Sequence, residues 1–304
     1  MRTTLLLSIA FLLLESTAFS QITIKSREGY LPFQELPCTY IKNPGMTMPT
    51  EGENMVWDYT NLVACDNCEF SIKYEKKDSL FPKSESVRWD ESTVLGHPYP
   101  IKFYYGFDND GDFCEFGAIG EEVIVSAESF TGNTRDRVTR RKRVSTQKEL
   151  LKDYPLEYGK TWTEVRSDTS FLVVNSRTVR LKNLEVREIG TFTRETTVIG
   201  HGDLKLSYWE NDEKKYVTYK ALLTKKVVSN HFNFSSDASK KLLDFVLSYA
   251  GILNNSGLPS CTTYTFEVRE LFPYVLSFSK CDDSKTPEIV MMRTDLGNHL
   301  PIKE

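Results

Sequence analysis

Beyond its first 20 residues, the sequence has no apolar run approaching the about 20 residues that a membrane-spanning helix needs. It also lacks a G-x-S-x-G elbow, an H-E-x-x-H pair and a glycine-rich phosphate loop. Its four histidines, His97, His201, His231 and His299, are scattered, so we expect surface or hydrogen-bonded residues rather than metal ligands. An enzyme here would have to use carboxylates that only the fold brings together.

The chain also lacks a strong charge of either sign, with 38 Lys and Arg against 42 Asp and Glu and a net charge of −4. Nucleic-acid-binding domains are usually basic, so we predict no nucleic-acid partner. One local exception is the basic run RDRVTRRKR, residues 135–143. A solvated loop or an edge strand guarded by positive charge explains this run, and a grip on phosphate or an anionic polysaccharide is the alternative.

The N-terminus reads MRTTLLLSIAFLLLESTAFSQ. One Arg precedes the apolar run Leu5–Leu14, and the small residues Ala18 and Ser20 stand just before Gln21, an order typical of a secretory signal peptide. We predict a signal peptide at 1–20 and an exported protein, periplasmic or secreted, with no transmembrane segment in the mature chain. No cysteine precedes Cys38, so we expect no lipoprotein acceptor.

The six cysteines are even in number, which in an exported protein points to disulfides. We predict disulfide bonding for all six, Cys38, Cys65, Cys68, Cys114, Cys261 and Cys281. Cys261 with Cys281 is the favoured pair, because a hairpin there would bring the two segments together. Cys65 and Cys68 have the spacing of half a zinc site, but no second C-x-x-C or H-x-x-x-H follows.

Strand patterns dominate the chain. Tyr264, Phe266 and Val268 alternate with polar residues, a period of two that buries one face, and 217–221 behaves in the same way. Further strands are expected at 70–75, 99–107, 121–127, 170–175, 191–199 and 204–209. Many short strands bounded by Gly, Asn and Asp predict a mainly β fold, with antiparallel sandwich or barrel-like sheets.

One segment in the C-terminal half has helical spacing, with Leu242, Phe245, Val246 and Tyr249 on one face. We predict a helix at 237–253 that covers its own sandwich or, as the alternative, contacts a partner. A boundary near Asp153 divides the chain into an N-terminal β region at 21–153 and a C-terminal β region at 154–304. A single domain is the alternative to this division.

The stretch DNDGDFCEF, residues 108–116, is the nearest approach to a chemical motif. Asp108, Asp110 and Asp112 are spaced as in oxygen-rich calcium loops, which makes them candidate calcium ligands. The twelve-residue helix–loop–helix pattern is missing, and strand-like runs lie on both sides. Asn109–Gly111 suits the positive φ of a hairpin turn. We predict a hairpin turn, with calcium as the alternative and no other cofactor.

Three stretches resemble exported β-rich proteins of the Bacteroidota. GENMVWDYTNL, residues 52–62, resembles their G-x-x-x-x-W-D-[FY]-[ST]-x-L stretch. GHGDLKLSYWENDEKKYVTYK (200–220) and YTFEVRELFPYVLSF (264–278) resemble their Gly-x-Gly-x-Leu hairpin and closing aromatic hairpin. We expect Trp57 to be a core anchor. Many such proteins carry a type IX secretion sorting domain, and the sequence stops at TDLGNHLPIKE without one. The resemblance therefore implies periplasmic residence or an outer-membrane assembly.

These patterns favour an exported, non-catalytic binding or structural protein, in the periplasm or associated with the outer membrane. Its partner would be a protein or a glycan. The alternative is a secreted glycan-acting hydrolase that uses unmarked carboxylates. A hydrolase would show two acidic side chains about 5–10 Å apart across an aromatic-lined groove.

Overall fold

The computed structural model describes residues 22–32, 34–42, 46–76, 79–94, 97–238, 240, 244, 260–281 and 286–298. Up to residue 152 the strands are β1 (Thr23–Ile24), β2 (Gln34–Ile41), β3 (Gly52–Asp58), β4 (Ala64–Lys76), β5 (Ser86–Val94), β6 (His97–Phe107), β7 (Phe113–Gly120), β8 (Val123–Ser126), β9 (Arg137–Arg140), β10 (Arg143–Ser145) and β11 (Glu149–Lys152). After it come β12 (Leu156–Glu157), β13 (Thr161–Ser176), β14 (Leu181–Glu210), β15 (Glu213–Ser235), β16 (Cys261–Val268), β17 (Leu271–Lys280) and β18 (Ile289–Arg293). A four-residue helix, α2 (Glu128–Thr131), and a 3-10 turn, η2 (Leu296–Asn298), complete the described elements.

Nearly all the described strands belong to one sheet, in the order β10-β7-β6-β5-β4-β2-β18-β17-β16-β15-β14-β13-β9-β8. Strand β11 pairs with β7 and β3 with β14, whereas β1 and β12 form a small separate sheet. Neighbours run antiparallel except β3, which lies parallel to β14. The order begins and ends at different strands, so the sheet is open. The prediction of a mainly β, antiparallel fold is confirmed.

The two predicted regions, 21–153 and 154–304, contribute strands to this same sheet. Strand β2 of the first region pairs with β18 of the second, at Cys38 and Arg293, and β3 pairs with β14. The boundary near residue 153 stays a prediction.

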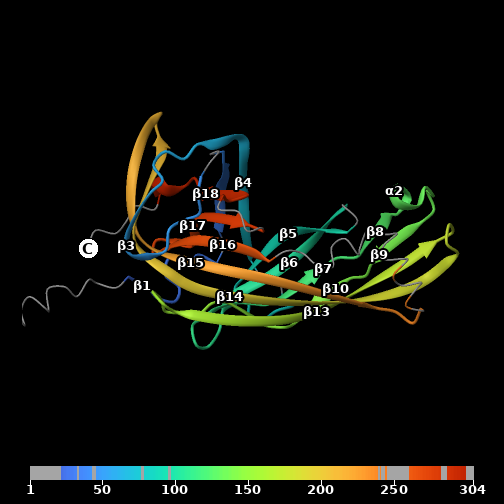
Figure 1. Ribbon diagram of the computed structural model, residues 1–304. Coiled ribbons are helices and arrows are strands. Elements are labelled where there is room, and N and C mark those ends of the chain that lie inside the picture. The colour runs from blue at the N-terminus through green and yellow to red at the C-terminus, as the bar shows by residue number, and fades with distance from the viewer. Residues whose placement is uncertain are drawn as a thin grey trace, which may run out of the picture.

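Strands β13, β14 and β15 run along the length of the molecule, and the other large strands stand over one side of them (Figure 1). β14 and β15 form one long hairpin, in which Glu210 pairs with Glu213. The two residues between them, Asn211 and Asp212, have φ of 51° and 62°. Positive φ at both central residues is the geometry of a type I′ turn, whose twist matches that of long antiparallel strands.

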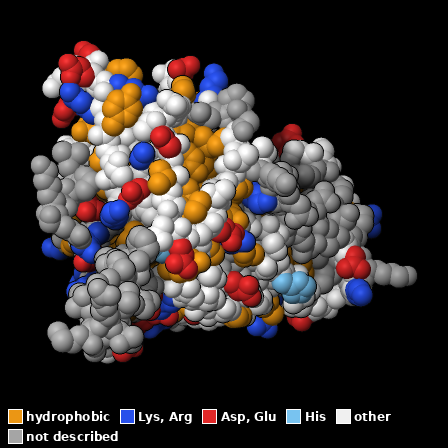
Figure 2. All heavy atoms as spheres, turned by 60° about the vertical axis from the view of Figure 1, so that its left-hand side comes forward, with side chains coloured by type: hydrophobic (Ala, Val, Ile, Leu, Met, Phe, Trp, Pro, Cys, Tyr) orange, Lys and Arg blue, Asp and Glu red, His pale blue; other side chains and the backbone are white. Residues whose placement is uncertain are grey.

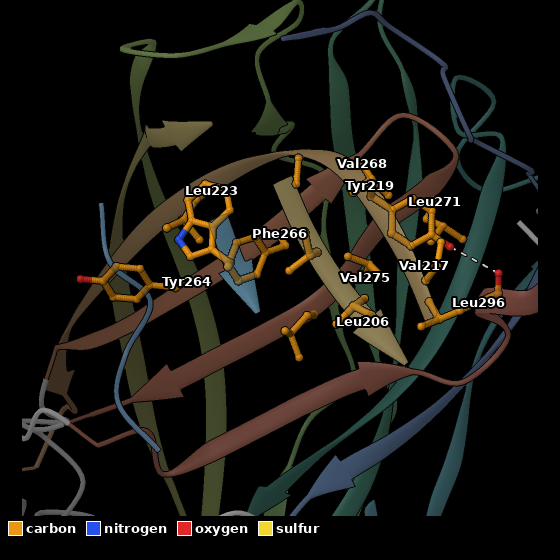
Figure 3. Close-up of a cluster of buried hydrophobic side chains, with 14 of the residues drawn as sticks. Leu206, Val217, Tyr219, Leu223, Tyr264, Phe266, Val268, Leu271, Val275 and Leu296 are labelled. Atoms are coloured by element: carbon orange, nitrogen blue, oxygen red, sulfur yellow. Dashed lines mark hydrogen bonds between the residues drawn. The ribbon is translucent and has the colours of Figure 1, made fainter. Parts of the chain in front are cut away.

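The largest apolar cluster lies on one face of β14–β17, beneath β3 and η2. Trp57 of β3 packs edge-on against Phe266 of β16, with 5.0 Å between ring centroids, and donates its Nε1 hydrogen to Thr50 O at 2.9 Å. Tyr219 donates its hydroxyl hydrogen to Leu296 O at 3.3 Å (Figure 3). The prediction that Trp57 is a core anchor is confirmed.

β14 changes the face that it buries at a bulge. The register shifts between Val198 and Gly200. Val198 therefore packs in the cluster of Trp162 and Leu222, whereas Leu204 packs in the cluster of Trp57. A Cβ on Gly202 would lie 2.0 Å from Met55 O, so only glycine allows β3 to approach this closely. The sequence predicted two strands, 191–199 and 204–209, where the structure has one bulged strand.

The predicted helix at 237–253 falls almost entirely outside the described residues, which include only 237, 238, 240 and 244 of that segment. It is not among the described elements. The predicted signal peptide at 1–20 also lies outside them. Among the described residues, no helix has the length and apolar character to cross a membrane.

Candidate functional site

The two layers of the fold meet along a row of charged and polar side chains. One layer is formed by β13–β15; the other includes β7, β10 and β11. The cross-strand register places Trp162, Thr196 and Lys226 side by side on β13, β14 and β15. Directly paired residues share a face of a sheet. Since Trp162 is buried against Leu150 of the strand β11, this face points towards the other layer. We call it the inner face.

Arg166 of β13 stands at the centre of the inner face. Its Nη1 lies 2.6 Å from Glu115 Oε1 of β7 and 3.0 Å from Glu149 Oε2 of β11. Its Nη2 lies 3.3 Å from Asp168 Oδ2. Burial, together with the neighbouring Glu149 and against the opposing effect of Arg166, raises the pKa of Glu115 to about 7. This arginine therefore holds three carboxylates from three strands.

Further ion pairs extend the row along the layer junction. Arg194 Nη1 of β14 lies 2.5 Å from the other carboxylate oxygen of Glu149. The ammonium group of Lys152 on β11 pairs with Glu267 of β16 and lies 2.5 Å from Pro273 O. Burial raises the pKa of Glu267, an effect that Lys152 opposes. Sequence reasoning missed this cluster, because its partners come from strands far apart in the chain.

Several hydrogen-bond donors on the inner face have no partner among the described residues. They are the indole Nε1 of Trp162, the hydroxyl of Thr196 and the Nε atoms of Arg166 and Arg194, all buried. Lys226 is half-buried, and no hydrogen bond or ion pair to its amine is found within the described part of the chain. Burial, and then repulsion from Arg194, lower the pKa of Lys226 to about 8. The inner face therefore has a surplus of donors.

The carboxylates of this cluster do not form the pair that a glycosidase needs. Glu115 and Glu149 are only 5% and 4% exposed, and both lie against Arg166. A glycosidase acid must reach the glycosidic oxygen, and its partner must face the sugar from the other side. These two groups are bound to cations instead.

The predicted turn at residues 108–116 is a hairpin between β6 and β7. Phe107 pairs with Phe113, and Asp108 N donates to Asp112 O at 3.0 Å. Gly111 supplies a positive φ of 87°. The hairpin prediction is confirmed.

Two of the three aspartates of this turn have protein partners for their carboxylates. Asp108 Oδ1 accepts from the backbone N–H groups of Asp110 and Asp112 at 2.9 and 3.0 Å, and Lys148 Nζ lies 2.5 Å from Asp108 Oδ2. Asp112 Oδ1 accepts from Tyr154 N at 2.7 Å. Within the described ranges, no group of three or more His, Cys, Asp or Glu is placed to hold a metal ion. Calcium binding stays a prediction.

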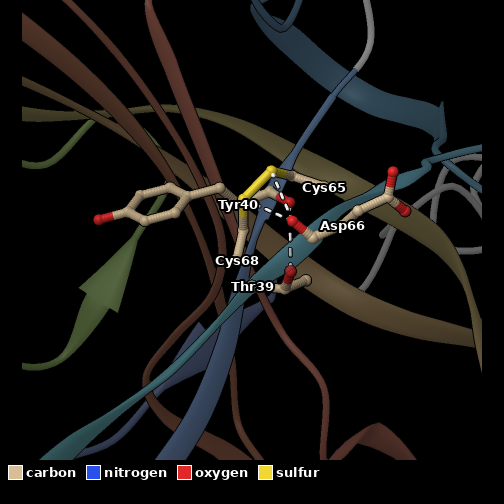
Figure 4. The surroundings of a disulfide bond; sticks show 5 residues. All are labelled: Thr39, Tyr40, Cys65, Asp66 and Cys68. Atoms are coloured by element: carbon tan, nitrogen blue, oxygen red, sulfur yellow. Dashed lines mark hydrogen bonds between the residues drawn. A yellow bond between two sulfur atoms is a disulfide. The ribbon is translucent and has the colours of Figure 1, made fainter.

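Two disulfides are present. Cys261 and Cys281 pair across the open end of the β16–β17 hairpin, as predicted, with a Cα–Cα distance of 4.0 Å. Cys65 and Cys68 pair within β4 (Figure 4). There the register of β2 shifts between Thr39 and Ile41, so residues 65–68 bulge out opposite Tyr40. The C-x-x-C pair thus forms a disulfide that closes a bulge. This agrees with the prediction of a disulfide rather than half of a zinc site.

The prediction that all six cysteines form disulfides needs correction for Cys38 and Cys114, which are free and buried. The reason is their placement in different apolar clusters. Cys38 packs with Leu36 and Tyr74, whereas Cys114 packs with Phe116. Burial raises the pKa of the Cys38 thiol to about 11 and that of Cys114 to about 12.

The basic run at 135–143 forms β9, β10 and their link, and most of its cations have carboxylate partners. The pairs are Arg140–Glu188 (2.6 Å), Arg141–Glu185 (2.8 Å), Lys142–Glu121 (3.5 Å) and Arg143–Asp168 (3.1 Å). β10 lies at one end of the sheet order. The run therefore matches the guarded edge strand better than a grip on an anionic polymer.

Among the described residues, the most exposed aromatic side chains lie at the tip of the β14–β15 hairpin. Trp209 and Tyr216 are 73% and 66% exposed. Ser207 pairs with Tyr216, and Trp209 follows Ser207 by two residues, so both rings lie on the same face of the hairpin. Lys214 lies over the Tyr216 ring at 5.7 Å. On the side of the molecule that carries this tip, hydrophobic side chains are interspersed with charged ones (Figure 2).

No family model, no curated protein and no solved structure matches the chain.

Proposed function

We propose that the chain is an exported, non-catalytic binding protein whose partner is another protein, docked at the tip of the β14–β15 hairpin. The observation that carries this proposal is the exposure of Trp209 and Tyr216 on one face of the hairpin. The tip stands away from the rest of the sheet at the upper left of Figure 1. Burying large aromatic rings that are exposed to water is favourable when a partner binds. Trp and Tyr are enriched among the residues that contribute most to the affinity of protein interfaces.

The surroundings of the two rings support a protein partner over a glycan. Glu210, Glu213, Lys214 and Lys215 lie next to them at the tip and supply charges of both signs. An aromatic centre with a charged rim is the usual anatomy of a protein–protein interface. The interior carboxylates, bound to arginines, favour this non-catalytic function over the glycan-acting hydrolase.

Export, to the periplasm or an outer-membrane assembly, is part of the proposal. Two disulfides suit an oxidising compartment. The leader sequence and the resemblance to exported Bacteroidota proteins point the same way, and both remain to be tested by N-terminal sequencing and fractionation of the native cells.

The binding proposal is tested by cross-linking in the native cells. A photo-reactive residue at position 207, on the face of Trp209 and Tyr216, is expected to join the chain to one defined protein. The double variant Trp209→Ala/Tyr216→Ala should lose this product. The matched control, Trp89→Ala, removes an exposed tryptophan of β5 and should keep it.

Two outcomes would contradict the proposal. A product that persists in the double variant would show that the rings do not carry the contact. If the wild-type chain binds to a glycan array and the double variant does not, the tip binds a glycan rather than a protein.

A further inference from the structure

We propose that the inner face of β13–β15 binds a small organic anion, a carboxylate with an apolar body, whose carboxylate lies at Trp162, Thr196 and Lys226. This site is separate from the hairpin tip and does not depend on the function proposed there. Three observations carry it: the register that gathers donors, the Lys226 amine that has no partner among the described residues, and the apolar side chains farther along the same face.

The donors lie together because of strand register. Trp162 pairs with Thr196, and Thr196 pairs with Lys226, so the three side chains leave the same face in a line across three strands. The indole and hydroxyl groups are buried and have no partner among the described residues. A buried donor without an acceptor destabilises the fold, so this position favours a ligand rich in acceptors. A carboxylate offers two oxygens to such a line.

The row holds carboxylates as well as cations, including Glu164, which pairs in register with Arg194, but Lys226 is the cation that a ligand carboxylate could reach. Arg194 is paired with Glu149 and Lys152 with Glu267. Lys226 stands beside these pairs without a carboxylate of its own in the described part of the chain. A ligand carboxylate would supply it, and charge-assisted hydrogen bonds are the stronger kind.

The groups that act on the Lys226 amine come from four other strands, Arg88 of β5, Glu149 of β11, Arg194 of β14 and Glu267 of β16. The two arginines and burial outweigh the two carboxylates, which is why the pKa of this amine is lowered. A bound anion would reverse that balance and raise the pKa.

The apolar body is indicated by apolar side chains farther along the inner face, which lie there beside the polar Glu164, Arg166 and Asn230. Val228 follows Lys226 at two residues, and Phe192 and Phe232 lie farther along on the same side. All three are half-buried rather than fully covered, so apolar surface remains for a ligand. The two rings meet edge to face with 5.6 Å between centroids. They lie beside Gly190, where a Cβ would be 2.9 Å from the Phe192 ring.

The test uses octanoate as the probe, measured by isothermal titration calorimetry on the mature chain at pH 7. Octanoate is expected to bind the wild type, and Lys226→Met is expected to weaken it at least tenfold. Lys225→Met is the matched control, because the neighbouring Lys225 belongs to the opposite face and lies 3.3 Å from Glu51. This control should bind as the wild type does.

A second measurement needs no variant. Acetylation of Lys226 in the wild type, followed by peptide mass spectrometry, is expected to slow when octanoate is present, with Lys225 as the internal reference. No binding of octanoate, equal binding by Lys226→Met, or unprotected Lys226 would overturn the site. If octan-1-ol binds as tightly as octanoate, the site does not recognise the carboxylate charge. If inorganic phosphate binds as tightly as octanoate, the site does not recognise an apolar body.

Discussion

Arg166 of β13 and Glu115 of β7 form an ion pair of 2.6 Å between the two layers, with side chains only 9% and 6% exposed. The pair is accompanied by Glu149 and Asp168, so one guanidinium neutralises carboxylates from both sides of the junction. A group buried in this way depends on its partner, because removing either one leaves a charge without water or counterion.

We therefore expect Arg166→Met to lower the free energy of unfolding by about 3–5 kcal/mol, measured by urea denaturation at pH 7. The control is Arg141→Met, which removes an arginine from the exposed pair with Glu185 and should cost less than about 1 kcal/mol. Equal losses in the two variants would show that the Arg166 cluster contributes no more than a surface pair.

The raised pKa of Glu115 predicts a pH dependence. Its value in the folded chain is about 7, against 4.5 for an ordinary glutamate. Between these values the folded state holds a proton that the unfolded state has lost. The stability that this proton provides is fully present below pH 4.5 and is lost as the pH rises through 7, a change on the order of 3 kcal/mol.

Glu115→Gln should remove the pH-dependent stability that Glu115 provides. The difference in urea midpoint between the variant and the wild type is therefore expected to change between pH 5 and pH 8. Glu121→Gln, at an exposed carboxylate, serves as the control. A constant difference between Glu115→Gln and the wild type over that range would contradict the raised pKa.

The free cysteines can be counted chemically. Cys38 and Cys114 are buried, and burial raises the pKa values of both thiols, so neither should react with a disulfide reagent at pH 8 in the folded chain. In urea without reductant, we expect two thiols per chain. Finding none there would indicate a third disulfide.

The turn of the long hairpin predicts opposite effects for two substitutions at one position. Asp212 has a φ of 62°. Asp212→Gly should be neutral or stabilise by up to about 1 kcal/mol, because glycine adopts positive φ without strain. Asp212→Val should destabilise by about 1–2 kcal/mol, because a β-branched side chain opposes that backbone conformation. Thermal unfolding of both variants checks the pair, and equal shifts would exclude a backbone cause.

Local patterns predicted much of the fold. The alternation through 217–221 is confirmed, since Val217, Tyr219 and Ala221 are buried and Lys220 is exposed. The hairpin turn at Gly111 was predicted because turn residues need special φ values that few side chains accept. The hairpin that turns at Asn211–Asp212 was indicated only by the resemblance of residues 200–220. The Cys261–Cys281 pair followed from the same local reasoning, since a hairpin joins its ends.

The site could not be predicted in this way. The alternation around Phe266 suggested one buried face, yet Glu267 is also buried, because β11 covers the second face and brings Lys152 to it. The two residues are far apart in sequence, and no spacing rule connects them.

The pairing of Cys38 with Arg293 has a consequence for the timing of folding. The middle of the sheet joins β2, an early strand, to β18, the last described one. While the chain is being synthesised, the edge of β2 that pairs with β18 therefore stays unpaired until β18 has been made. Contacts of such high sequence separation make folding slow. Until β18 is available, the edge of β2 therefore offers unpaired N–H and C=O groups with which another chain could pair.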